Sequence, residues 1–129
     1  LWSRGLGDVY KRQPQIDIPT GGAPQDLVIE DLVVGDGAEA VPGGMVEVHY
    51  VGVDFETGEE FDSSWDRGGS IEFPFSGLIE GWQEGIPGMR AGGRRKLIIP
   101  PEKAYGPAEL GQDLSGRTLV YIIDLISVN

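Results

Sequence analysis

The fold is decided by the segment GLIEGWQEGIPGM, residues 77–89, the one stretch of this chain that has a helical pattern. Trp82 and Ile86 are four residues apart, so both project from one side of a short helix running from Ile79 to about Ile86. The segment nevertheless contains four glycines and a proline. These residues cost a helix interior roughly 1 and 3 kcal/mol relative to alanine. Local helix propensity therefore does not explain why a tryptophan stands here.

The segments on both sides of this helix alternate as β-strands do. In MVEVHYVGVDF, residues 45–55, and in TLVYIIDLISV, residues 118–128, every second side chain falls on one apolar face. Further strands are predicted within LVIEDLVVGDG (27–37), in a hairpin that returns through Phe61, and at residues 70–75 and 94–100. The sequence thus predicts an α+β fold, a five-stranded antiparallel sheet wrapped around one short helix.

Composition excludes several classes of function. The chain has 129 residues and a formal net charge of −11, so we expect no nucleic acid partner and no binding to an anionic membrane. The one basic run, Arg94-Arg95-Lys96, is typical of a solvated strand edge. There are no cysteines, and no run reaches the roughly 18–20 apolar residues of a membrane span. We expect a cytoplasmic protein; the start at Leu1 leaves export with a removed leader as the alternative.

The N-terminal residues differ from the rest of the chain. Residues 1–13 contain three basic side chains and one acidic side chain, have no clear period, and are interpreted as a disordered tail or an artefact of the sequence. Residues 14–25 are rich in proline and glycine and predict an extended arm. The globular domain is therefore expected to span residues 26–129.

Polar side chains give weak signals for catalysis. His49, the only histidine, alternates to the face opposite Tyr50, and no serine elbow accompanies it, so a structural role is favoured. Five carboxylates crowd one hairpin, which is more typical of a solvated turn than of an acid/base pair. Asp62 differs because it follows Phe61, and a half-buried carboxylate needs a partner such as Arg67 or a tyrosine hydroxyl. No metal site and no cofactor are predicted.

Aromatic residues give the stronger signal. Four of them come from four different predicted strands at inward parity, namely Tyr50, Phe61, Phe73 and Tyr121. Trp82 comes from the one helix, where it would form the floor of a concavity, and Tyr105 lies in the loop AYGPAEL. Tyrosine and tryptophan bury well only when their polar atoms find partners. The pattern predicts an aromatic-lined binding site for a mostly apolar ligand.

Four blocks in order, VHYVGVDFETGEEFDSSWDRG, LIEGWQEGIPGM, GGRRKLIIPPEKAYGP and TLVYIIDLI, resemble the FKBP-type peptidyl-prolyl isomerases. The resemblance covers about residues 43–128. It implies the FKBP-like roll, rotation of X–Pro bonds without a covalent intermediate, and proline-containing polypeptides as partners. It also implies binding of macrolides such as tacrolimus or rapamycin, and we expect a monomer.

The resemblance implies the site residues one by one. The catalytic residues would be Asp62 in FDSS, Tyr105 in AYG and Trp82 as the pocket floor. The substrate-binding residues would be Tyr50, Phe61, Ile71, Phe73, Leu78, Ile79, Leu114 and Tyr121. Ile71 stands where many members have a further aromatic residue.

Two alternative functions are also consistent with parts of the sequence. The loop after AYG lacks the HPG-like or IPP-like segment common in the family, which would suit a non-catalytic proline-binding or chaperone module. A hydrolase using Glu59, Glu60 or Asp62 would instead need one strongly perturbed acid in a cleft. Turnover of a proline-containing tetrapeptide, together with tacrolimus binding, separates the three.

Overall fold

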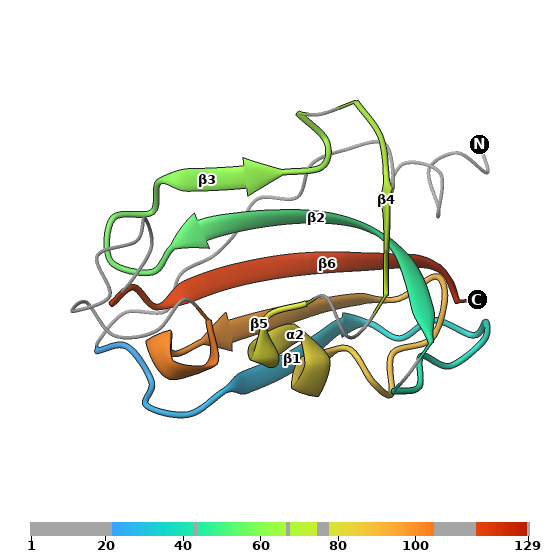
Figure 1. Ribbon diagram of the computed structural model, residues 1–129, viewed down its shortest axis with the longest axis horizontal. Helices are drawn as coiled ribbons and strands as arrows, with labels where there is room; N and C mark the ends of the chain where they lie inside the picture. Colours follow the sequence, from blue (N-terminus) through green and yellow to red (C-terminus); the bar gives the residue numbers. More distant parts are fainter. Residues whose placement is uncertain (1–21, 43, 67, 75–77, 105–115, 129) are drawn as a thin grey trace.

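The computed structural model describes residues 22–42, 44–66, 68–74, 78–104 and 116–128. Within them, six strands form one sheet in the order β1-β5-β6-β2-β3, with β4 also paired to β2, and every pairing is antiparallel (Figure 1). The strands are β1 (Val28–Val33), β2 (Met45–Asp54), β3 (Glu60–Ser63), β4 (Ile71–Pro74), β5 (Arg94–Ile99) and β6 (Leu119–Val128). The helices are α2 (Glu80–Gly85) and the 3-10 helix η3 (Pro101–Lys103). The predicted α+β fold is confirmed.

The sequence predicts five strands, and the sheet has six because β3 and β4 both pair with the same edge of β2. Strand β4 pairs with the first half of β2, from Met45 opposite Pro74 to Val48 opposite Ile71. Strand β3 pairs with the second half of the same edge, where Gly52 lies opposite Asp62. One long strand therefore carries two short partners in succession. This arrangement brings residues of β3 and β4 to the same side of the molecule.

Alternation along the central strands separates two apolar clusters. Strand β6 lies between β5 and β2, and its fully buried residues Leu119, Ile123 and Leu125 face the main core. Val120 faces the other way and packs in a smaller cluster with Val53, Phe55 and Ile98. Because side chains of a strand alternate between faces, the main core and its aromatic residues lie on the face that α2 covers.

Helix α2 is held by close packing rather than by its own propensity. It has only six residues and no side-chain cap at its N-terminus, and isolated helices this short are unstable in water. A Cβ built on Gly81 would lie 2.5 Å from Ile99 Cγ2, and one on Gly85 would lie 2.7 Å from Leu97 Cδ1. The two glycines thus let the helix backbone lie directly on β5, in front of which it appears in Figure 1. Trp82 is thereby pressed into the core.

The prediction for the basic run at residues 94–96 is wrong. Strand β5 lies inside the sheet, between β1 and β6. Arg94 pairs with Asp124 and Arg95 pairs with Asp31, each with 2.6 Å between guanidinium Nε and carboxylate oxygen. Local composition could not reveal this, because both partners come from strands distant in sequence.

Within the described residues, no helix is long and apolar enough to cross a membrane.

Substitution Gly85→Ala tests whether close packing seats the helix. Alanine would stabilise a solvated helix by up to about 1 kcal/mol. Here the added methyl group would lie 2.7 Å from both terminal methyl groups of Leu97, which is fully buried, so Leu97 would have to shift inside a packed core. We expect urea unfolding to show a loss of about 1–3 kcal/mol in the free energy of unfolding. The matched control is Gly69→Ala, where nothing lies within 4 Å of the new Cβ. Equal or greater stability of Gly85→Ala would contradict this account.

Candidate active site

Three aromatic rings from three strands meet the edge or face of Trp82. The ring centroids of Tyr50 (β2) and Tyr121 (β6) both lie 5.1 Å from that of Trp82, and Phe73 (β4) lies 5.8 Å away. The interplanar angles are 82°, 86° and 86°. Edge-to-face contacts of this kind fix the rings relative to one another beyond simple burial. Four residues far apart in sequence therefore form one rigid aromatic cluster.

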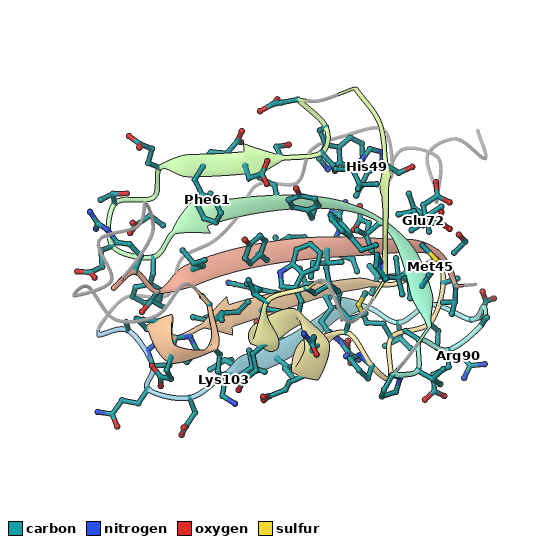
Figure 2. The ribbon with its side chains drawn as sticks, viewed as in Figure 1. Met45, His49, Phe61, Glu72, Arg90 and Lys103 are labelled. Atoms are coloured by element: carbon teal, nitrogen blue, oxygen red, sulfur yellow. The ribbon has the colours of Figure 1, made fainter. Side chains whose placement is uncertain are left out.

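Phe61 extends this cluster from β3, where Figure 2 labels it. Its ring centroid lies 5.6 Å from that of Tyr121 at an interplanar angle of 89°. Gly52 of β2 lies beneath both rings, because a Cβ there would be 2.7 Å from Phe61 Cζ and 2.8 Å from Tyr121 Cε1. Sequence reasoning missed Gly52, although a glycine inside a strand commonly marks such a close approach.

The cluster has a dry floor and partly exposed walls. Trp82 is 3 % exposed, and Tyr50 and Tyr121 are each 4 % exposed. The remaining predicted binding residues within the described chain are half-buried and pack against this core: Phe61, Ile71, Phe73, Leu78 and Ile79. Together with Trp82, Tyr50 and Tyr121, these five residues make eight predicted site residues that lie in or against one core. Asp62 is described separately below. Tyr105 and Leu114 lie outside the described residues.

A hydrogen bond connects the acidic candidate to this cluster. The Tyr50 hydroxyl donates to Asp62 Oδ2 at 2.7 Å, which confirms the prediction that a tyrosine hydroxyl serves as a partner of Asp62; Arg67, the other predicted partner, lies outside the described residues. Ser64, fully buried, accepts from the Tyr50 backbone N–H at 2.7 Å through its Oγ. The end of β3 therefore fixes both the hydroxyl and the backbone of Tyr50. The role of Ser64 was not predicted, since serine in FDSS has no periodicity that reports it.

Two donors at the cluster lack an acceptor among the described residues. The indole Nε1 of Trp82 is buried and makes no hydrogen bond there. The Ile79 N–H precedes the first turn of α2, where backbone donors have no intrahelical acceptor. In contrast, the Ile79 carbonyl accepts from the backbone N–H groups of Trp82 and Gln83 at 3.0 and 3.1 Å. The Ile79 N–H lies at the N-terminal end of α2, on a residue that packs against the core containing this cluster.

The other polar candidates lie elsewhere. His49 stacks on Trp65 with 4.0 Å between ring centroids and 13° between planes, and its Nδ1 lies 2.8 Å from Ser64 Oγ. It belongs to the face of β2 opposite Tyr50, as predicted, and is half-buried rather than solvated. Glu59 and Glu60 are exposed. Within the described ranges, no group of three His, Asp or Glu side chains is arranged to hold a metal ion.

Within the described residues, an antiparallel sheet packs against the short helix α2, whose tryptophan forms the floor of an aromatic cluster, and this arrangement agrees with the FKBP-like roll expected from the sequence. The family described as FKBP-type peptidyl-prolyl cis-trans isomerase matches residues 37–126. The chain belongs to this family, and the predicted enzyme class is confirmed.

Relatives and solved structures agree with this assignment. The chain is 74% identical over 115 residues to a probable FK506-binding protein of Corynebacterium glutamicum, covering 89% of this chain and 98% of that one. It is 48% identical over 120 residues to an FK506-binding protein of Streptomyces anulatus, covering 90% and 97%. A solved putative peptidyl-prolyl isomerase, FKBP12 of Mycobacterium tuberculosis, is similar with a TM-score of 0.60 and 47% identity, covering 90% and 94%.

The environment of His49 predicts how stability depends on pH. Burial lowers the pKa of His49 below its usual 6.5, while Asp124 and Glu47 oppose this effect. Between the folded and unfolded pKa values the unfolded chain binds more protons, so stability is full above about pH 6.5 and falls as the pH drops below it.

Denaturant unfolding between about pH 7.5 and pH 5.5 measures this dependence, since His49 is the only histidine. The wild type should lose stability towards the acidic end, and His49→Gln should give a flatter profile. Equal slopes for the two proteins would show that His49 does not titrate differently on folding.

Proposed function

We propose that this chain accelerates rotation of X–Pro bonds by enclosing the prolyl ring against Trp82, Tyr50 and Tyr121. The observation that carries the proposal is the cluster of three nearly dry rings, each of the two tyrosines 5.1 Å from the indole. Rigid apolar walls of this kind suit a pyrrolidine ring, and half-buried Phe73 and Phe61 would close over it. No nucleophile and no metal are needed for the reaction.

Desolvation supplies the physical basis of catalysis. The barrier to peptide rotation, about 18–20 kcal/mol, comes from amide resonance. The twisted transition state loses this resonance, so its carbonyl carries less negative charge and needs less solvation than the planar ground state. Transfer into a dry aromatic site therefore penalises the ground state more than the transition state. Lowering the barrier by about 6–8 kcal/mol would accelerate rotation roughly 10⁴- to 10⁶-fold.

Polar groups around the rings would orient the peptide. We assign the Ile79 N–H as a donor to a substrate carbonyl, since no described residue accepts from it. Asp62 would orient the Tyr50 hydroxyl through the 2.7 Å hydrogen bond. Following the resemblance, the Tyr105 hydroxyl would bind a second carbonyl and Leu114 would add an apolar contact. Leu78 and Ile71 would form the outer walls.

The family as a whole binds proline-containing peptides and FK506, and we propose both as ligands of this chain. The relatives from Corynebacterium glutamicum and Streptomyces anulatus carry the name FK506-binding protein. We further propose a monomeric, cytoplasmic enzyme whose clients are polypeptides with exposed X–Pro bonds. The alternative of a non-catalytic proline-binding module predicts FK506 binding without turnover.

Substitution Trp82→Ala tests the pocket floor. We expect a protease-free isomerisation assay on a proline-containing tetrapeptide to show at least about a hundredfold lower kcat/KM, or about 2.7 kcal/mol. Trp65→Ala is the matched control, because Trp65 stacks on His49 outside the cluster. Truncating a buried tryptophan costs about 3–5 kcal/mol of stability, so Trp82→Leu serves as a milder variant. Full turnover by folded Trp82 variants would show that the pocket is wrongly assigned.

A double-mutant cycle tests the bond between Tyr50 and Asp62. If Asp62 acts by orienting the hydroxyl, Tyr50→Phe and Asp62→Asn should each lower kcat/KM by about tenfold, about 1.4 kcal/mol. The double variant should then lose no more than either single one, because the two groups act as a unit. Losses that simply add would show that Asp62 acts independently of Tyr50.

A further inference from the structure

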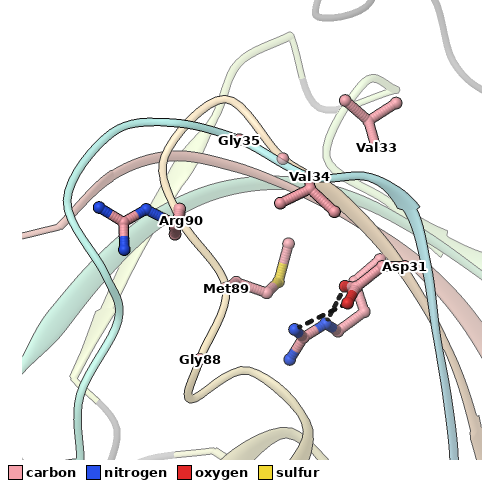
Figure 3. A pocket seen from close by; sticks show the side chains of 9 residues that line it. Asp31, Val33, Val34, Gly35, Gly88, Met89 and Arg90 are labelled. Atoms are coloured by element: carbon pink, nitrogen blue, oxygen red, sulfur yellow. Dashed lines mark hydrogen bonds and ion pairs between the residues drawn. The ribbon is translucent and has the colours of Figure 1, made fainter.

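A buried arginine connects the end of α2 to two strands. The Arg95 side chain is 10% exposed, and its Nε lies 2.6 Å from Oδ1 of Asp31 on β1. Its Nη1 donates to the Gly85 carbonyl at 2.7 Å and to the Pro87 carbonyl at 3.2 Å. Figure 3 shows Asp31 beside the segment that contains Gly88 and Met89, with dashed lines for the ion pair. One guanidinium therefore binds β1 and the segment that ends the helix.

The end of α2 depends on these contacts. The last carbonyls of a helix have no intrahelical partner, and α2 has no basic residue of its own in its last turn. Arg95 supplies the missing donors from β5. A small cavity of about 30 Å³ borders the segment after the helix, lined by Met89, Gly88 and Val34 among others. Ile86 and Met89 of this segment are buried in the main core, and Arg95 adds hydrogen bonds to the carbonyls of Gly85 and Pro87, on either side of Ile86.

Trp82 lies in the same turn of helix that Arg95 secures. The Trp82 carbonyl accepts from the Ile86 N–H at 3.0 Å, the residue directly after Gly85. Gly85 in turn rests on Leu97, two residues beyond Arg95 in β5. A shift of the helix end would therefore move the indole relative to Tyr50 and Tyr121. Misplacement by about 1 Å can cost about a hundredfold in rate when catalysis depends on fixed geometry.

We propose that Arg95, oriented by Asp31, is a positioning residue for the isomerase reaction because it fixes the helix that carries Trp82. This inference rests on the proposed function of Trp82 as the pocket floor. A lysine cannot replace it, since a single ammonium lacks the planar fork that reaches a carboxylate and two carbonyls together. Its role is geometric, and it does not contact the substrate.

The experiment compares Arg95→Lys with Arg94→Lys. Arg94 is the matched control, because it also holds a carboxylate through two hydrogen bonds, to Asp124 at 2.6 and 2.8 Å. We expect both variants to lose thermal stability. Arg95→Lys alone should lower kcat/KM for the tetrapeptide by about tenfold, and should shift the indole ¹H–¹⁵N resonance of Trp82. That resonance is assigned from Trp2→Phe and Trp65→Phe proteins.

Each outcome decides the proposal. It is overturned if Arg95→Lys loses stability like Arg94→Lys but keeps wild-type kcat/KM, or if the Trp82 resonance moves without a change in kcat/KM. If Arg95→Lys does not fold, Asp31→Asn replaces it, with a smaller loss of kcat/KM and a smaller shift expected. The resonance reports the place of Trp82 whatever the site does, whereas failure of the proposed function would appear as full turnover by Trp82→Ala.

Discussion

The contact between a glycine-bearing helix and the middle of the sheet is the constraint on which the rest of this structure depends. Gly81 and Gly85 remove the Cβ atoms that would collide with Ile99 and Leu97. The helix can then approach until Trp82 meets rings from β2, β4 and β6 edge-on. A helix kept farther away by larger side chains would leave the rings without a common floor. Weak local propensity is thus compensated by tertiary packing.

Much of this site could be predicted from the sequence, because side chains of a strand alternate between its two faces. Residues at inward positions of alternating strands must face one core, so Tyr50 and Tyr121 were correctly placed with Trp82. Pairings across long sequence separations could not be predicted, because no local pattern encodes them. Arg95 and Asp31, 64 residues apart, form an ion pair in which the arginine is buried and the aspartate is exposed, where composition indicated a solvated edge. The stack of His49 on Trp65 was hidden for the same reason.

The two faces of β2 carry different chemistry. On the inner face Tyr50 belongs to the aromatic cluster, while on the outer face His49 lies near Ser64 and Trp65. Ser64 contacts both residues, since its Oγ accepts from the Tyr50 N–H and lies 2.8 Å from His49 Nδ1. Ser64, the residue that directly follows β3, therefore holds β2 from the side opposite the aromatic cluster. The hydrogen bond from the Tyr50 N–H to Ser64 fixes the backbone of β2, and so helps to hold the Tyr50 ring in the aromatic cluster on the other face.

The central claim is that a prolyl ring rests on the indole of Trp82. Intermolecular nuclear Overhauser effects, measured between a proline-labelled tetrapeptide and the protein, test it most directly. We expect contacts from the proline ring protons to the Trp82 indole and to the rings of Tyr50 and Tyr121. Contacts to another surface, with none to Trp82, would contradict the account.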